Sequence, residues 1–240
     1  MVGACVVIVS VYTYIVPASV KCLTVYTMDS DLKRTYQEAA DYLSAHDPIL
    51  APVIAKYGLC TIQPHTNYYQ DLVESIIGQQ LSVKAAGTIR DRFKALFDNT
   101  LPTPEAIVTT DIDVMRSAGL SNQKANYIRD LAQHILDGKI SFDNIDTLSN
   151  DDIIKILTDV KGIGEWTVHM FLMFCMGRLD ILPVGDLGIR NGIMKLYDLD
   201  HAPTPQEVKD IAKANGWAPY ESIASWYIWK SLDNKPAIND

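Results

Sequence analysis

The stretch DVKGIGEWTVHM, residues 159–170, places two glycines around an isoleucine between two segments of helical periodicity. Glycine adopts positive φ readily, so a Gly-x-Gly turn between two helices lets another backbone approach closely. The amides of Gly162, Gly164 and Glu165 would then lie at the start of the second helix, where unpaired N–H groups and the helix dipole attract an anion. The turn predicts a phosphate site made by the main chain, to which Lys161 adds one positive charge.

The charge balance of the chain constrains any polyanionic partner. The 240 residues carry a formal net charge of −8, with 48% hydrophobic and 21% charged residues, an ordinary composition for a soluble globular protein. Nucleic-acid binding usually relies on clustered Lys and Arg, so phosphate contacts would have to come mainly from backbone amides. A plain helix end with a close helix crossing has the same Gly-x-Gly pattern, and the turn alone leaves that alternative open.

The four cysteines, Cys5, Cys22, Cys60 and Cys175, lie far apart in the sequence. They form no CxxC pair, and no histidine stands at metal-ligand spacing from them. Their pattern predicts neither a zinc site nor an iron–sulfur cluster. We expect buried free thiols in a reducing cytoplasm.

The first 27 residues differ from the rest, because MVGACVVIVSVYTYIV (1–16) is apolar and no charge precedes Lys21. A signal peptide needs a basic start, and a spanning helix needs about 20 apolar residues, whereas Pro17 closes this stretch. Three interpretations stay open: an irregular or upstream-extended segment (1–27), a strand packed on the body, and a membrane or export signal. The first is favoured, with the folded domain over 28–236.

From Asp29 onward the apolar residues follow helical periodicity. Ser82 and Ser121 are predicted N-caps, and Lys124 is expected on the surface of its helix. These patterns predict an all-α protein. The predicted helices cover residues 31–46, 48–56, 67–80, 82–97, 104–118, 121–136, 150–158, 167–176, 187–197, 204–214 and 219–232.

The order of several motifs carries a family resemblance. IIKILTDVKGIGEWTVHMFLMF (153–174) followed by LPVGDLGIR (182–190) resembles the helix-hairpin-helix (HhH-GPD) DNA glycosylase superfamily, within it the alkylation-repair branch of 3-methyladenine DNA glycosylase II type. The resemblance extends over most of 30–232 and includes VESIIGQQLSVKAA (73–86), GLSNQKANYIRDLA (119–132) and WAPYESIASWYIWK (217–230).

The resemblance implies a fold of two helical lobes with the active-site cleft between them. One lobe would comprise residues 28–66 and 187–236. The other would comprise 67–186 and contain the hairpin, 159–165.

Asp186 stands where the family has its catalytic aspartate, although an aspartate before a helix is also an ordinary N-cap. Cleavage of an N-glycosidic bond develops positive charge on the sugar, which a carboxylate stabilises while it orients or deprotonates water. An alkylated, cationic base leaves as a neutral molecule and needs no strong acid. Bifunctional relatives carry a lysine at position 166 that forms a Schiff base; Trp166 predicts a monofunctional enzyme without lyase activity.

The target nucleotide has to leave the duplex before its bond can be cut. The resemblance makes Gln80, beside Gln79, the plug that fills its place, and puts Trp166, Met170 and Trp229 in the base pocket. Aromatic rings attract a cationic base by about 0.5–2 kcal/mol per contact. Four further aromatic residues are expected to pack in the core, and His169 is expected to be structural. The four are Trp217, Tyr220, Trp226 and Tyr227.

Family hairpins also hold a monovalent cation on backbone carbonyls, which here would be those of Thr158, Val160 and Ile163, with Na+ or K+ as the ion. The resemblance implies no cofactor for catalysis and no iron–sulfur cluster. One departure is Glu221, because relatives often have a basic residue after the corresponding Pro-Tyr. A weaker phosphate contact is expected there.

The predicted function is hydrolysis of alkylated purines, of the 3-methyladenine and 7-methylguanine class, from DNA by base flipping, which leaves an abasic site for base excision repair. Two alternatives stay open: a glycosylase for another lesion class, and a non-catalytic helix-hairpin-helix DNA-binding protein. The expected partner is double-stranded DNA with a damaged base, with no membrane. We expect a monomer in the cytoplasm (nucleoid), or in the nucleus of a eukaryote.

Overall fold

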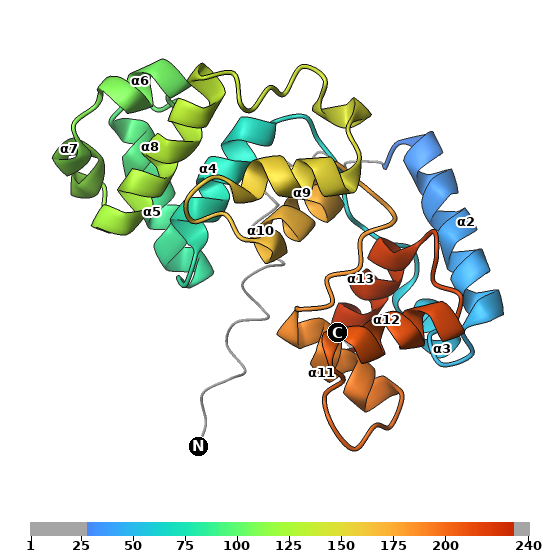
Figure 1. Cartoon of the computed structure of the whole chain (residues 1–240). Helices are drawn as coiled ribbons and strands as arrows, with labels where there is room; N and C mark the ends of the chain where they lie inside the picture. The colour runs from blue at the N-terminus through green and yellow to red at the C-terminus, as the bar shows by residue number, and fades with distance from the viewer. Residues whose placement is uncertain (1–27, 233–240) are drawn as a thin grey trace, which may run out of the picture. The chain divides into compact units, whose positions relative to one another are not determined.

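The computed structural model describes residues 28–232. The expected N-terminal segment 1–27 and the end of the 28–236 domain lie outside the described residues. Within 28–232 every regular element is helical (Figure 1), which confirms the all-α prediction. No helix in this range is both long and apolar enough to cross a bilayer.

The described chain folds into two compact units. Residues 65–176 form one, called here the hairpin unit, and residues 28–64 with 177–232 form the other, called the aspartate unit. The expected lobes had residues 177–186 with the hairpin. These residues instead group with the aspartate unit, because Ser222 N donates to Leu179 O (2.8 Å) and Ile181 N donates to Ser222 Oγ (3.0 Å).

The hairpin unit is built around α8, on which α4, α6 and α7 pack. Ser82 and Ser121 cap α5 and α8, because their hydroxyls accept from Ala85 N (3.3 Å) and Lys124 N (3.2 Å), as predicted. The helix expected over 167–176 begins earlier and becomes π-helical, with all five residues of that last segment buried. The elements are α4 (Tyr68–Gly78), α5 (Val83–Ala95), α6 (Pro104–Thr109), α7 (Ile112–Ser117), α8 (Asn122–Leu136), η1 (Ile145–Thr147), α9 (Asn150–Thr158), α10 (Glu165–Met170) and the π-helical η2 (Phe171–Cys175).

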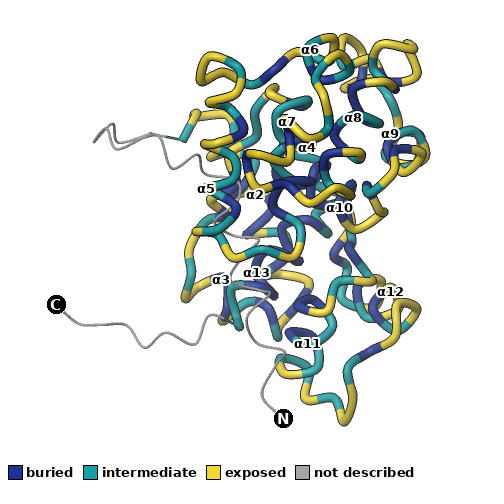
Figure 2. The backbone as a smooth tube through the Cα atoms, turned by 90° about the vertical axis from the view of Figure 1, so that its left-hand side faces the viewer, coloured by how far each residue is buried: buried dark blue, intermediate teal, exposed yellow. Residues whose placement is uncertain are grey.

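The aspartate unit is built around α13, which packs against α2, α3 and α11. Figure 2 shows the burial along the tube, and in α13 residues 222–229 are all buried. Such a helix has no polar face, as expected for one at the centre of a core. The elements are α2 (Ser30–His46), α3 (Ala51–Tyr57), α11 (Leu187–Leu196), α12 (Pro205–Ala214) and α13 (Glu221–Ser231).

A buried carboxylate connects four segments of the aspartate unit. Asp47 is fully buried, and its Oδ1 accepts from Ile49 N (2.9 Å) and Leu50 N (3.0 Å). Its Oδ2 accepts from Trp217 Nε1 (2.7 Å) and from the Tyr197 hydroxyl. The hydrogen bonds from these two backbone amides to Asp47 hold residues 48–50 in a turn. Helix α3 therefore begins at Ala51 and not, as predicted, at Pro48.

The Asp47→Ala variant should lose about 3 kcal/mol or more of unfolding free energy, because it leaves the buried donors of Trp217 and Tyr197 unpaired. Denaturant titration followed by circular dichroism measures the loss. Asp41→Ala, which removes an exposed carboxylate that accepts a hydrogen bond from Gln37 Nε2, is the control and should change stability by about 0.5 kcal/mol or less. Equal losses in the two variants would contradict the role of Asp47.

Candidate active site

The glycine turn joins α9 to α10 in a tight hairpin. Gly162 has φ +85°, and a Cβ there would lie 2.0 Å from the Tyr127 ring, so both the conformation and the space demand glycine. Gly164 is the N-cap of α10 with φ −97°. The turn therefore uses the positive φ that glycine allows at Gly162, whereas Gly164 has the extended backbone of a helix N-cap.

Two buried side chains of the hairpin and the carboxylate of Asp130, on α8, hold the hairpin backbone in place. Val160 and Ile163 are 1% and 3% exposed, and Ile163 N donates to Val160 O (3.1 Å). Lys161 N donates to Asp130 Oδ2 (2.9 Å), and its Nζ lies 3.7 Å from Asp130 Oδ1. Lys161 thus adds less net positive charge to the hairpin than the sequence predicted, because Asp130 offsets it.

The predicted plug residue follows α4 in an unusual conformation. Gln80 is exposed and has φ +58°, a left-handed conformation that non-glycine residues adopt rarely. It therefore projects from the chain just after the helix ends. The fold has to hold the backbone on its N-terminal side for this geometry to persist.

Two side chains hold that backbone. Lys124 Nζ donates to Ile77 O (2.8 Å) and to Gln79 O (2.6 Å), and Gln79 Nε2 donates to Gly162 O (2.7 Å). Burial lowers the pKa of Lys124, as expected for an ammonium group withdrawn from water. The sequence placed Lys124 on the helix surface. The missed clue is that the last carbonyls of α4 need donors.

Asp186 is the N-cap of α11, and one of its oxygens receives two hydrogen bonds. Oδ1 accepts from Ile189 N (2.8 Å) and from Trp229 Nε1 (2.9 Å). Asp186 therefore is the N-cap of α11 and at the same time the candidate catalytic carboxylate; the two interpretations do not exclude each other. Trp229 is 7% exposed, and its indole supports the carboxylate; its place in the base pocket stays a prediction.

Two glycines allow α11 and α13 to approach each other closely enough for that contact. A Cβ on Gly188 would lie 2.9 Å from Asp186 Oδ1 and 3.0 Å from the Trp229 ring. A Cβ on Gly192 would lie 2.4 Å from Ile228 Cγ2. Any larger residue at either place would push the tryptophan or its helix away from the carboxylate.

The hairpin unit has a hollow of about 1120 Å³. Trp166, Met170, Gln80 and Gly162 line it, so four of the predicted site residues meet there. Trp166 is 41% exposed, which is unusual for a large aromatic side chain in a folded protein. Its exposed ring is the candidate stacking surface of this unit.

The remaining aromatic residues and His169 behave as structural groups. Trp217, Trp226 and Tyr227 are at most 1% exposed, which confirms core packing for these three, and Tyr220 packs edge-on to Tyr42 in the same unit. His169 Nε2 lies 3.7 Å from Glu165 one turn earlier, and burial lowers the pKa of the imidazole.

Glu221 begins α13 at the place where a basic residue was expected from the family. Burial raises the pKa of its carboxyl, and the nearby Asp180 adds to the effect. An acid in the first turn suits the helix dipole. The negative charge makes this helix start a poor phosphate site.

The family model described as HhH-GPD superfamily base excision DNA repair protein matches residues 73–216, which include the hairpin, Lys124 and Asp186. The chain belongs to this family. Trp229 and the rest of α13 lie beyond the matched residues, so the indole bond to Asp186 comes from the fold rather than from that match.

Relatives and solved structures agree with this HhH-GPD assignment. DNA-3-methyladenine glycosylase 1 of Schizosaccharomyces pombe is 39% identical over 165 residues, 68% of this chain and 72% of the relative. The structure of a DNA-3-methyladenine glycosidase from Bacillus halodurans has a TM-score of 0.74 at 36% identity and covers 82% of this chain and 89% of its own. That of the Schizosaccharomyces pombe 3-methyladenine DNA glycosylase with abasic DNA has a TM-score of 0.69 at 34% identity, covering 80% and 95%.

Gly188→Ala should destabilise this HhH-GPD chain by about 1–3 kcal/mol, because the new methyl group meets a carboxylate oxygen and an indole that are both held in place. Gly185→Ala is the matched control, since a Cβ there has no neighbour within 4 Å. It should be neutral or slightly stabilising. The two unfolding free energies from denaturant titration decide; a stabilising Gly188→Ala would overturn the close-contact argument.

Lys124→Met should release the end of α4, because two carbonyls lose a charged donor that is worth about 1.5–3 kcal/mol. Hydrogen exchange should then become faster for the amides around Ile77–Leu81. Lys84→Met, at an exposed lysine of the neighbouring helix α5, should leave that exchange unchanged. Unaltered protection in Lys124→Met would show that the plug geometry does not need this lysine.

Proposed function

We propose that this protein is a monofunctional DNA glycosylase of 3-methyladenine glycosylase II type. It hydrolyses the N-glycosidic bond of alkylated purines in DNA and leaves an abasic site. The observation that carries the proposal is the Asp186 carboxylate, which two hydrogen bonds on Oδ1 hold in one orientation in a chain of the HhH-GPD family.

Asp186 supplies the negative charge that the transition state requires. As the base departs, the sugar becomes an oxocarbenium-like cation. A carboxylate already fixed by the Ile189 amide and the Trp229 indole need not reorganise during the step, which is the main advantage of a preorganised site. The same carboxylate orients or deprotonates the attacking water.

The proposed reaction needs no strong general acid, because of the kind of base that is removed. An alkylated purine is already cationic, so it leaves as a neutral base without protonation. The exposed ring of Trp166 attracts such a base by stacking and cation–π interaction, worth about 0.5–2 kcal/mol. A neutral undamaged purine gains less from the ring and is a poorer leaving group.

Position 166 also supports the monofunctional assignment. A lyase needs an amine that attacks the sugar and forms a Schiff base, and an indole cannot do so. Lys161, on the hairpin, is paired with Asp130. Water is then the nucleophile, and the product is an intact strand with an abasic site.

DNA binding in this scheme relies on the hairpin backbone. Gly164 is the N-cap of α10 and has no capping side chain, so the amides of Gly162, Gly164 and Glu165 are suited to a phosphate. Gln80 takes the place of the extruded nucleotide, and Lys124 and Gln79 hold it there. A net charge of −8 is compatible with this mode because the donors are uncharged.

The monovalent cation that the fold family implies fits the hairpin chemically. Carbonyl oxygens are hard donors that suit Na+ or K+, and Thr158, Val160 and Ile163 lie in one short turn whose shape the buried side chains of the last two maintain. These three carbonyls would hold the ion, which would add positive charge to the hairpin where a phosphate is proposed to bind. The ion would be structural, and the proposed catalysis uses no cofactor. We propose a monomer acting in the nucleoid or nucleus.

Base release from methylated DNA by the wild type and Asp186→Asn tests this function. Free-base chromatography should detect 3-methyladenine and 7-methylguanine, with release by the variant slower by about 100-fold or more. Asp180→Asn, at an exposed acid of the same unit, should retain the wild-type rate.

Other outcomes have distinct meanings. Equal release by Asp186→Asn would remove the mechanism, and activity only on oxidised or deaminated bases would assign another lesion class. DNA binding without release of any base would indicate a non-catalytic module. Strand nicking without added base or heat would contradict the monofunctional assignment.

A further inference from the structure

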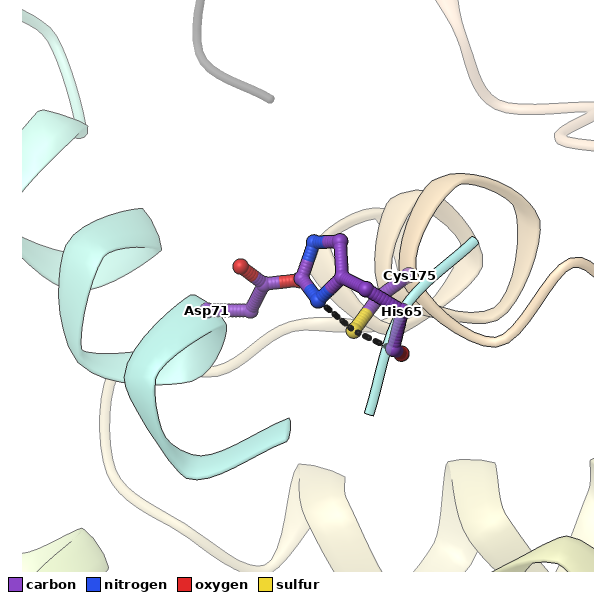
Figure 3. A group of neighbouring side chains, drawn as sticks. All are labelled: His65, Asp71 and Cys175. Carbon is purple, nitrogen blue, oxygen red and sulfur yellow. Dashed lines mark hydrogen bonds and ion pairs between the residues drawn. The ribbon is translucent and has the colours of Figure 1, made fainter. Parts of the chain in front are cut away.

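Three side chains with different donor atoms meet in the hairpin unit, which does not contain Asp186. His65 precedes α4, Asp71 lies in the first turn of α4, and Cys175 ends η2. Figure 3 shows the imidazole between the carboxylate and the thiol. Nothing in the Asp186 chemistry uses these groups.

The ligand atoms of the three residues all lie within 4.8 Å of one another. His65 Nε2 is 3.2 Å from Asp71 Oδ2, and His65 Nδ1 is 3.9 Å from Cys175 Sγ. Ligands of a tetrahedral zinc ion are separated by about 3.3–3.8 Å, given bonds of about 2.0–2.3 Å. One ion can bind only one of the two imidazole nitrogens, and with one nitrogen the three ligand atoms lie within 4.8 Å of one another. An ion would therefore draw the widest pair together by up to about 1 Å.

The main chain fixes two of these residues to each other. His65 N donates to Cys175 O (2.9 Å), and the Cys175 thiol donates to His65 O (3.6 Å). Residues 110 positions apart are thus held side by side by backbone contacts. The fold therefore brings His65 and Cys175 next to each other.

The cluster is sheltered from bulk water. Cys175 is 2% exposed, and the side chains of His65 and Asp71 are 31% and 27% exposed. Exposed acidic groups commonly gather on protein surfaces without binding an ion, but a buried sulfur beside a nitrogen and an oxygen is a different donor set. Sheltered ligands are released less readily to solvent and define the coordination better.

We propose that His65, Asp71 and Cys175 form a binding site for Zn²⁺ or a similar divalent transition-metal ion. Thiolate, imidazole and carboxylate are all zinc ligands, whereas sulfur excludes Mg²⁺ and Ca²⁺ as preferred ions. A thiolate and a carboxylate bring two negative charges, which a divalent ion neutralises. Binding displaces the thiol proton and any proton shared between His65 and Asp71 to solvent.

Three protein ligands leave one position of a tetrahedral ion open, as in sites that bind water or a substrate. Asp71 and Cys175 also line the hollow that contains Trp166 and Met170. The fourth ligand would therefore come from this hollow. It would be water, or a nitrogen or oxygen atom of a heterocyclic molecule bound there.

Titration with Co²⁺ alone tests the site, because cobalt replaces zinc and reports thiolate ligation by a charge-transfer absorption in the near ultraviolet. The full chain should be used without thiol reductants, under anaerobic conditions, with Cys5 and Cys22 replaced by serine. One equivalent of cobalt should produce the band, and Zn²⁺ should abolish it. Competition with a chromophoric chelator then gives the zinc affinity.

Cys175→Ser should eliminate the band, and Asp71→Asn or His65→Ala should weaken zinc binding by about tenfold or more. Cys60→Ser, which removes the other buried free cysteine of the described residues, should keep the band, as should Asp186→Asn. This last variant separates the metal site from the proposed excision chemistry. Far-ultraviolet circular dichroism checks that each variant is folded.

The outcomes divide cleanly. Saturable binding that requires Cys175 and His65 supports the site. No saturable binding, a band that survives Cys175→Ser, or a band lost in Cys60→Ser overturns it. If Cys175→Ser does not fold, His65→Ala carries the decision, and zinc affinity equal to that of the parent protein refutes the proposal.

Discussion

The orientation of the Asp186 carboxylate depends on how closely two helices approach each other. Gly188 and Gly192 add no side chain of their own between α11 and α13, so the Trp229 indole reaches Asp186 Oδ1 at 2.9 Å. The Ile189 amide reaches the same oxygen from inside α11. A carboxylate held from two directions keeps its charge in place, which is what stabilisation of a developing sugar cation requires. The Asp47 contacts support the same unit by tying α2 and α3 to Tyr197 and Trp217.

The hairpin unit is proposed to bind DNA, a polyanion, although the chain itself has a net charge of −8. The groups proposed to bind phosphate there are mainly backbone amides, and side chains hold the surrounding backbone in place. Gln79 bonds to the hairpin at Gly162, and Lys124 holds the end of α4. One connected set of contacts therefore orients both the turn proposed to bind phosphate and the residue proposed to enter the duplex. Lys124 acts here as a structural donor, and its charge is directed inward to carbonyl oxygens.

Local features of the fold were predictable from sequence, because they depend on residues close together in the chain. The caps at Ser82 and Ser121 involve amides three residues away, and helical periodicity marks the helix interiors. Predictions went wrong where a distant group intervened. Asp47 holds a turn that delays α3, and the contacts of Ser222 group residues 179–181 with the aspartate unit. None of these partners is visible in a local window.

The sequence by itself determined the helical class, the glycine hairpin and the ordered motifs that carry the family, with Asp186 and Trp166 among them. These follow from local propensity, from spacing and from the identity of single residues. Only the tertiary structure decided that Trp229 bonds to Asp186 from a buried position, and that His65, Asp71 and Cys175 share one site although their spacing predicted no metal ligands. The reason is physical: hydrogen-bond and coordination partners are chosen by distance in space, and a folded chain brings together residues that are 43 or 110 positions apart.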